Sequence, residues 1–196
     1  GAEVEDMLKI MPREEWIRIT ANPPLTGWTA AKILWVRKNE PENYNRCRHI
    51  LLPKDYIRYI LTGVFATEVS DASGMQLLDV PGRCWSDEVL KALNIDKDLL
   101  GKVYESCEAT GTLLADVAKR TGLSEKCMVA GGAGDNAAAA VGTGTVGDGA
   151  CNISLGTSGT VFISSEKFGV DETNGLHAFA HADGRYHLMG CMLSAA

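Results

Sequence analysis

Two glycine-rich turns contain the residues of this sequence that could do chemistry. The first is AGGAGDNAAAAVG, at 130–142, and the second is LGTSGT, at 155–160. Glycine is concentrated from 131 to 159, where the only charged residues are Asp135 and Asp148. Glycine allows sharp turns and lets another molecule come close to the backbone. A lone carboxylate in such a stretch is therefore a candidate for catalysis.

Asp135 follows the glycines directly and is expected to begin a helix. One interpretation is that it only caps free backbone amides and interacts with the helix dipole. Capping does not require the preceding glycines, which favour a bare loop that another molecule can approach. Asp135 would then be a general base that takes a proton from a hydroxyl, and Asn136 would hydrogen-bond a neighbouring hydroxyl of a polyol or sugar. A phosphate-binding loop is not expected here, because the Gly-Lys-Ser/Thr ending is missing and Asp135 would repel an anion.

The LGTSGT turn has the complementary chemistry. Its residues Gly156, Thr157, Ser158 and Gly159 are small and uncharged, and they offer two hydroxyls and uncovered backbone amides. Such a turn can surround phosphate oxygens with N–H and O–H donors, and it can equally be an ordinary hairpin turn. A group that activates a hydroxyl and a group that binds phosphate together indicate phosphoryl transfer.

Helices and strands alternate before residue 147, and hairpins follow it. Helices are expected at 29–39, with Trp35 on its apolar face, at 53–62, ended by Gly63, at 86–94, and at 113–121. Short strands are expected at 65–70 and 75–80, flanking a turn, and a buried strand at 127–132. Hairpins are expected at 150–165 and 177–190.

This change of pattern predicts an α/β protein with a domain boundary near 143–149, where GTGTVGDG would be the hinge. Two hairpins are too small to form a complete domain, so the second domain is expected to continue beyond the sequence.

The composition is that of a globular protein of 196 residues, with 45% hydrophobic and 22% charged residues. The net charge of −6 argues against nucleic acid or an anionic membrane as the main partner. The six cysteines form no CxxC motif, which favours reduced thiols and the cytoplasm. No signal segment and no run of apolar residues long enough to span a bilayer is found in the sequence.

Several other residues have structural explanations. Turn and capping chemistry accounts for Asp71 and Ser73, and Trp28 is expected in the core, like Trp35. Lys32 is given no catalytic role. Three histidines, at 177, 181 and 187, lie in the second hairpin. No acidic or cysteine partner stands beside them, so no metal site is expected.

The motifs together resemble the FGGY carbohydrate kinases. GWTAAKILWVRKN is similar to the signature helix of that family, with Thr29, Lys32 and Trp35 at matching positions. It is followed, in the order of the family, by LLPKDYIRYILTG, TEVSDASG, AGGAGDNAAAAVG and LGTSGT. The Asp-Asn-Ala run at 135–137 is most similar to the members that phosphorylate D-xylulose. Members that act on glycerol tend to have Asp-Gln-Gln there, and members that act on ribulose have a histidine close behind the aspartate.

The resemblance implies two actin-like, ribonuclease-H-like domains that close on a cleft. Residues 1–147 would be the C-terminal part of the first domain and 148–196 the start of the second. Asp135 would be the base acting on the C5 hydroxyl of D-xylulose, Asn136 a sugar contact, and Gly156, Thr157, Ser158 and Gly159 the site of the ATP phosphates.

The same resemblance implies ATP and Mg²⁺, with the magnesium ligands mainly outside this sequence, and it is compatible with a homodimer. A kinase for gluconate, ribulose, glycerol or erythritol is the alternative. Because the family's N-terminal phosphate loop and later adenine site are not in the sequence, the isolated chain is expected to be inactive, or to serve only as a folding or assembly unit.

Overall fold

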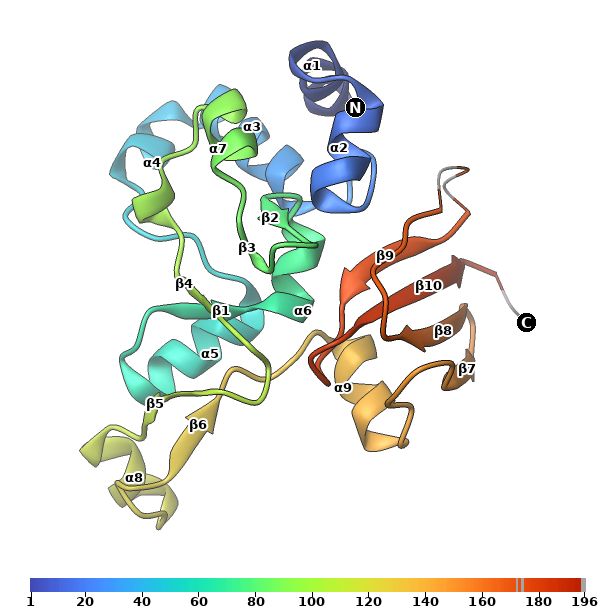
Figure 1. Ribbon diagram of the computed structural model, residues 1–196. Helices are drawn as coiled ribbons and strands as arrows, with labels where there is room; N and C mark the ends of the chain where they lie inside the picture. The colour runs from blue at the N-terminus through green and yellow to red at the C-terminus, as the bar shows by residue number, and fades with distance from the viewer. Residues whose placement is uncertain (172, 174, 195–196) are drawn as a thin grey trace.

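The computed structural model describes residues 1–171, 173 and 175–194. Helices and short strands make up the first part of the chain, and a four-stranded sheet makes up the last part (Figure 1). The helices are α1 (Ala2–Ile10), α2 (Arg13–Thr20), α3 (Thr29–Asn39), α4 (Pro41–Arg46), α5 (Pro53–Thr62), α6 (Val69–Ala72), α7 (Asp87–Leu93), α8 (Ala115–Thr121) and α9 (Asp135–Gly142), with 3-10 turns η1 (Ser73–Met75) and η2 (Lys97–Leu99).

Six very short strands lie between these helices along the chain, and they form three separate two-stranded sheets. β1 (Ala66–Glu68) pairs in parallel with β4 (Lys102–Tyr104). The antiparallel pairs are β2 (Leu78–Asp79) with β3 (Cys84–Trp85), and β5 (Ala109–Thr112) with β6 (Met128–Ala130). Together with α8, the pair β5–β6 projects from the lower end of the molecule in Figure 1 and has its own small apolar cluster.

The last part of the chain is one antiparallel sheet with strand order β7-β8-β10-β9. Its strands are β7 (Cys151–Leu155), β8 (Gly159–Ser165), β9 (His177–Ala180) and β10 (Tyr186–Met192). The LGTSGT turn joins β7 to β8, and β9 pairs with β10 across the turn that contains Asp183 and Gly184. Both hairpins expected from the sequence are confirmed.

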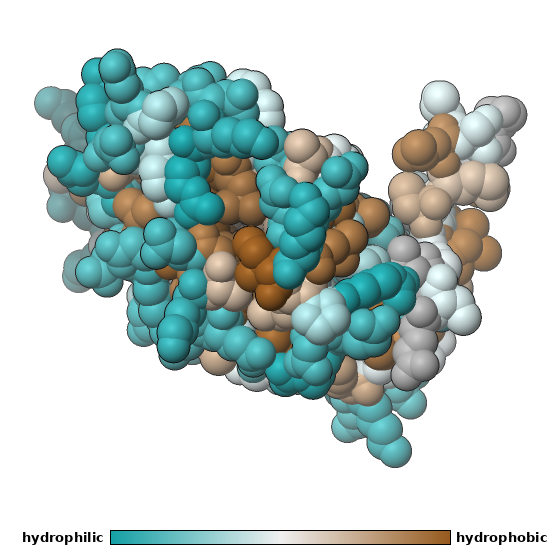
Figure 2. All heavy atoms as spheres, turned by 90° about the horizontal axis from the view of Figure 1, so that it is seen from above, coloured by the Kyte–Doolittle hydropathy of each residue, from teal (hydrophilic) through white to brown (hydrophobic). Residues whose placement is uncertain are grey.

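The main core lies among the helices and short strands of the first part of the chain. Trp16 of α2 is fully buried, and its indole donates to the carbonyls of Met7 and Met11. Ile33 and Leu34 of α3 join the same cluster, which reaches Ala178 of β9. From above, mostly hydrophilic side chains cover the helical end, and hydrophobic ones are visible in a hollow between them (Figure 2).

Side chains of the helical part occupy the outer edge of β9. The Asn22 side chain accepts from the Ala178 amide at 3.2 Å and donates to the Ala178 carbonyl at 2.7 Å. Ser73 Oγ accepts from the Ala180 amide at 3.1 Å. The backbone groups that a fifth strand would use are therefore bonded to side chains.

The structure confirms the helices expected from residues 29, 53 and 86, including the left-handed cap at Gly63 and the cap by Ser86. The helix expected from 113 begins at Ala115.

One expectation holds in part and two are wrong. The short strands expected at 65–70 and 75–80 are present as β1 and β2 but are shorter, because α6 and η1 between them take up Val69, Ser70 and Met75. The strand β6 is not buried, since Met128 is 72% exposed. Trp35 is 46% exposed, because it lies outside the buried stripe of α3.

Candidate active site

Asp135 is the first residue of α9, directly after the glycine loop that leaves β6, as the sequence predicted. Its Oδ1 accepts from the Asn136 amide at 2.7 Å and from the Asn136 side chain at 3.0 Å. Its Oδ2 has no hydrogen bond within the part of the chain that the structure describes. Asp135 is exposed, so one oxygen is oriented by its neighbour while the other is free to meet a ligand.

Internal packing explains two of the glycines before Asp135. A Cβ on Gly131 would lie 2.8 Å from the Glu105 carbonyl oxygen and 3.1 Å from the Glu68 Cβ. Gly132 has a φ of +81°, which L side chains rarely adopt. The expectation that these glycines only make the loop bare is therefore incomplete, because the scaffold under the loop requires them.

A buried carboxylate supports the loop from below. Glu68 is fully buried and accepts four donors: the Ser70 amide and hydroxyl, the Asp71 amide, and the Ser106 hydroxyl, at 2.7 to 3.0 Å. Ser70 Oγ in turn accepts from the Gly134 amide at 3.0 Å. Gly134 is the residue before Asp135, so this chain of hydrogen bonds fixes the start of α9.

Two cations of α5 hold the other end of the loop. Arg58 and Lys54 both donate to the Gly131 carbonyl, at 3.0 and 3.3 Å. Both also pair with the buried Asp55, at 2.9 and 2.8 Å, and Thr67 donates to the second Asp55 oxygen at 2.6 Å. Breaking such a buried pair would leave an uncompensated charge, which is strongly unfavourable. The ion pairs with Asp55 therefore keep Arg58 and Lys54 in place beneath the loop.

Asp135 and Asn136 open onto a cavity of about 180 Å³ between α6, α9 and the last sheet. Its other walls are formed by Trp28, Ser70, Asp71, Gly74, Gly134, Ala137, Phe179, His187 and Met189. Trp28 packs edge-to-face on His177 and Phe179, with ring centroids 5.5 and 5.8 Å apart. The sequence assigned Trp28 to the core, but the structure places it on the cavity wall.

Asp71 does not have the capping role expected from the sequence. The side chain that caps α6 is Glu68, and the Asp71 carboxylate lines the cavity instead. Burial raises the pKa of Asp71 to about 6; the Lys54 ammonium, 3.8 Å away, opposes this rise, while Glu68, Asp55 and Asp135 add to it. The sequence Thr-Glu-Val-Ser-Asp does indicate that Asp71 is available for another role. A four-residue helix needs only one capping carboxylate, and Glu68 already supplies it.

His187 is the third cavity residue, after Trp28 and Asp71, that the sequence did not indicate. It is 4% exposed and stacked between Phe162 and Phe179, and burial lowers its pKa to about 3. Its Nδ1 has no hydrogen-bond partner among the described residues. His187 is thus a neutral imidazole on the wall that faces Asp71 and Asp135. Nothing in its local sequence indicates this, because the sheet pairing brings it there.

The predicted phosphate-binding turn, residues 156–159, does not line this cavity. The turn at 156–158 is exposed and is closed by a bond from the Gly156 amide to the Ser158 carbonyl at 2.9 Å. Gly159 is buried and begins β8. None of the residues at 156–159 lines the cavity, so the structure brings Asp135 and Asn136 together and leaves the turn apart.

The described residues do not form a metal site of three or more protein ligands by themselves. Within 1–171, 173 and 175–194, no three His, Cys, Asp or Glu side chains are grouped so that they could hold a metal ion. His177 instead shares a hydrogen bond with Asn22, and His181 with the Thr145 carbonyl, both at 3.1 Å. Lys32, given no catalytic role above, donates to the Gly27 carbonyl.

Among the residues that the structure describes, the helices are too short or too polar to span a membrane.

Comparisons with known proteins identify the class. The model of the N-terminal domain of the FGGY family of carbohydrate kinases matches residues 2–142. The chain therefore belongs to the FGGY family, and the expected actin-like, ribonuclease-H-like α/β fold is confirmed.

The similar proteins carry a more particular name. The chain is 48% identical over 179 residues to a xylulose kinase of Escherichia coli K12, covering 91% of this chain and 37% of that protein. It is 39% identical to a "xyloylose kinase" of Brucella ovis, with a TM-score of 0.92 over 98% of this chain and 40% of the other. A xylulose kinase of Rhodospirillum rubrum, with a TM-score of 0.93 at 23% identity over 100% of this chain and 40% of the other, shows the fold alone. The chain thus spans well under half the length of these relatives.

Proposed function

We propose that the protein phosphorylates D-xylulose at its C5 hydroxyl with ATP, giving D-xylulose 5-phosphate and ADP. The observation that carries this proposal is the position of Asp135, whose unbonded oxygen stands at the mouth of a cavity with Asn136 beside it. The names of the relatives support D-xylulose as the substrate. The reduced thiols expected from the sequence are consistent with a cytoplasmic reaction.

In the proposed reaction, Asp135 takes the proton of the C5 hydroxyl. The hydroxyl oxygen then bonds to the γ-phosphorus of ATP, and the bond from that phosphorus to the bridging oxygen breaks, so that ADP leaves with the electron pair. Asn136, which orients Asp135 through two hydrogen bonds, would also contact a neighbouring sugar hydroxyl. No step is assigned to a metal, because the described residues form no metal site.

We assign the ATP phosphates to Gly156, Thr157, Ser158 and Gly159. This rests on the exposure of the turn at 156–158, which leaves the two hydroxyls accessible. We further place residues 1–147 in a first domain and 148–196 in a second, since the family match ends at residue 142 and the antiparallel sheet begins at Cys151. Closure of the two domains would bring the turn towards Asp135 and exclude water.

The substitution Asp135→Asn in the complete protein tests the base. We expect phosphorylation of D-xylulose to fall about 10²- to 10⁴-fold, as measured by coupled ADP release, with little change in ATP binding. Asp116→Asn is a matched control, because Asp116 is exposed on α8 and does not line the cavity. Turnover that is unchanged in Asp135→Asn would exclude Asp135 as the base.

Two further measurements address the alternatives. Rates with ribulose, gluconate, glycerol and erythritol, compared with D-xylulose, show which substrate is preferred. Titration of the 196-residue chain itself with ATP, magnesium and D-xylulose tests whether this segment acts alone. We expect no turnover from it, as for a folding or assembly unit.

A further inference from the structure

A second carboxylate lines the cavity and has no task in the proposed proton transfer. Asp71 lies on α6 directly against the loop that carries Asp135. A Cβ placed on Gly134 would lie 3.6 Å from both the Cα and the Oδ1 of Asp71. Asp71 and Asp135 therefore place two carboxylates on neighbouring parts of the cavity wall.

The charges around Asp71 leave it poorly compensated. Lys54 of α5 is the nearest cation, but its ammonium lies 2.8 Å from Asp55, 3.5 Å from Glu68 and only 3.8 Å from Asp71. Arg58 is 2.9 Å from Asp55. Of the remaining titratable groups that face it, Asp135 of α9 is a second acid and His187 of β10 is neutral. Asp71 thus receives the smallest share of the positive charge.

Hydrogen bonding shows the same contrast. Glu68 accepts four donors, and Asp55 accepts from Thr67, Lys54 and Arg58. The Asp71 carboxylate accepts no hydrogen bond from the described residues, although its side chain is only 31% exposed. A half-buried carboxylate of this kind needs donors, and a sugar with several hydroxyls can supply them.

We propose that Asp71 determines substrate specificity by accepting a hydrogen bond from a hydroxyl of a neutral sugar and by repelling sugar acids. This inference rests on the proposed function. A carboxylate can only accept hydrogen bonds, so it favours hydroxyl groups in the cavity. Asp71 and Asp135 together place two negative charges in the cavity that the substrate enters. Their repulsion of a substrate carboxylate lowers the affinity for a sugar acid.

The test compares the complete wild-type protein with Asp71→Asn, using D-xylulose and D-gluconate. Steady-state rates give kcat and KM for each sugar, and titration calorimetry gives the binding of each sugar without turnover. We expect Asp71→Asn to raise KM and Kd for D-xylulose about tenfold, the loss of one hydrogen bond to a charged group. The preference for D-xylulose over D-gluconate should fall at least tenfold, with kcat for D-xylulose nearly unchanged.

Two control variants make the test specific. Asp71→Glu keeps the charge and should still exclude D-gluconate, while Asp116→Asn on α8 removes an equal charge outside the cavity and should change neither ratio. A melting curve for each variant shows whether it folds, and Asp71→Glu carries the test if Asp71→Asn does not.

The outcomes separate the two proposals. Unchanged D-xylulose affinity and unchanged discrimination in Asp71→Asn, or loss of discrimination in Asp71→Glu, would overturn the role of Asp71 alone. A wild-type protein that neither phosphorylates nor binds D-xylulose would overturn the proposed function, and this inference with it.

Discussion

Asp71 and His187 face the same cavity, and burial disfavours the charged form of each. The pKa of Asp71 is raised to about 6, so the folded state binds its proton more tightly than the unfolded chain, and stability from this group falls as the pH rises from about 4 to 6. The pKa of His187 is lowered to about 3, so stability from this group falls as the pH drops from 6.5 towards 3. Between pH 4 and 6 the two effects oppose one another.

Replacing His187 by Phe should therefore remove part of the acid sensitivity. The new ring can still stack between Phe162 and Phe179, and it carries no ring nitrogen that needs a hydrogen-bond partner. We expect the loss in free energy of unfolding between pH 6.5 and 4.5 to be about 2 to 3 kcal/mol smaller than in the wild type. Urea denaturation at both pH values measures this. The exposed His49, replaced by Phe, is the control, and equal acid sensitivity of His187→Phe and wild type would contradict the expectation.

The sequence indicated Asp135 and Asn136 because their evidence is local: a glycine loop, a helix start and a single carboxylate. It did not indicate Trp28, Asp71 or His187 as cavity residues. Trp28 and Asp71 lie 43 positions apart, and His187 lies far beyond both. Packing of Trp28 beside Gly74 of η1 and of the last sheet against α6 brings the three together. The roles of Asp135, Asn136 and the turn at 156–159 stay predictions.

The loop between β6 and α9 depends on the element beneath it as much as on its own sequence. Gly131→Ala should destabilise the protein by about 1 to 3 kcal/mol, because the new Cβ would meet the Glu105 carbonyl oxygen at 2.8 Å and backbone would have to move. Gly142→Ala is the matched control, since nothing lies within 4 Å of its Cβ position in α9. It should be neutral or stabilising by up to about 1 kcal/mol. Urea denaturation of both variants decides this, and equal stabilities would contradict the packing argument.

Short elements limited what the sequence could predict about the fold. Helices with clear breakers were predicted well, since Pro53 and Gly63 act through local backbone geometry. The residues of β1 do form a strand, but it pairs in parallel with β4, some 36 residues later, and nothing local specifies such a partner. The two hairpins were predictable because adjacent strands and a glycine turn define them.

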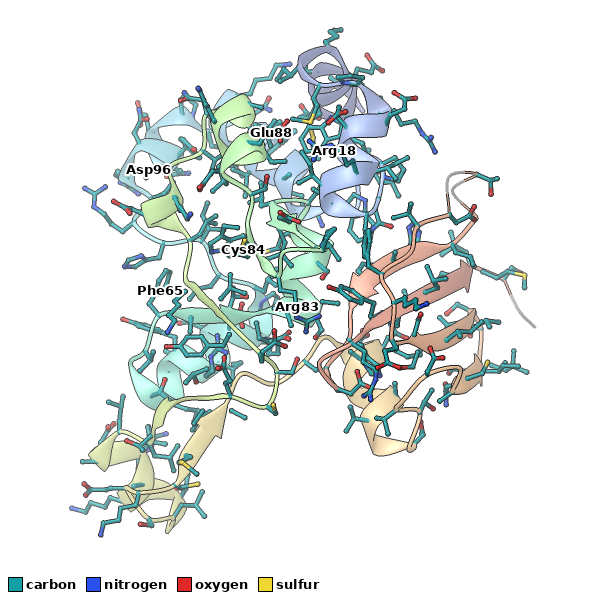
Figure 3. All side chains as sticks on the ribbon, viewed as in Figure 1. Arg18, Phe65, Arg83, Cys84, Glu88 and Asp96 are labelled. Atoms are coloured by element: carbon teal, nitrogen blue, oxygen red, sulfur yellow. The ribbon has the colours of Figure 1, made fainter. Side chains whose placement is uncertain are left out.

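At the scale of the molecule, Arg83 connects the helical part to the last sheet. Its guanidinium pairs with both oxygens of Glu105, at 2.7 and 2.6 Å, and donates to the Arg185 carbonyl at 2.8 Å in the turn between β9 and β10. Figure 3 shows Arg83 between the two parts, whereas Arg18 and Glu88 lie near the helical end.

Arg83→Met should therefore cost about 2 to 4 kcal/mol of unfolding free energy and lower the hydrogen-exchange protection of β9 and β10. Arg18→Met is the comparison, because the Arg18 pairs with Glu15 and Glu88 are exposed and should contribute at most about 1 kcal/mol. Equal losses in the two variants, or unchanged protection of the sheet in Arg83→Met, would show that Arg83 does not hold the sheet in place.

The side chains of Asn22 and Ser73 give the last sheet two unequal edges. They occupy backbone groups at the outer side of β9, so a strand from any other chain cannot lengthen the sheet there. The opposite edge is β7, where Ile153 and Leu155 are 63% and 77% exposed. Lateral growth of this sheet, whether by a neighbouring segment in folding or by another copy in aggregation, is therefore directed to one side only.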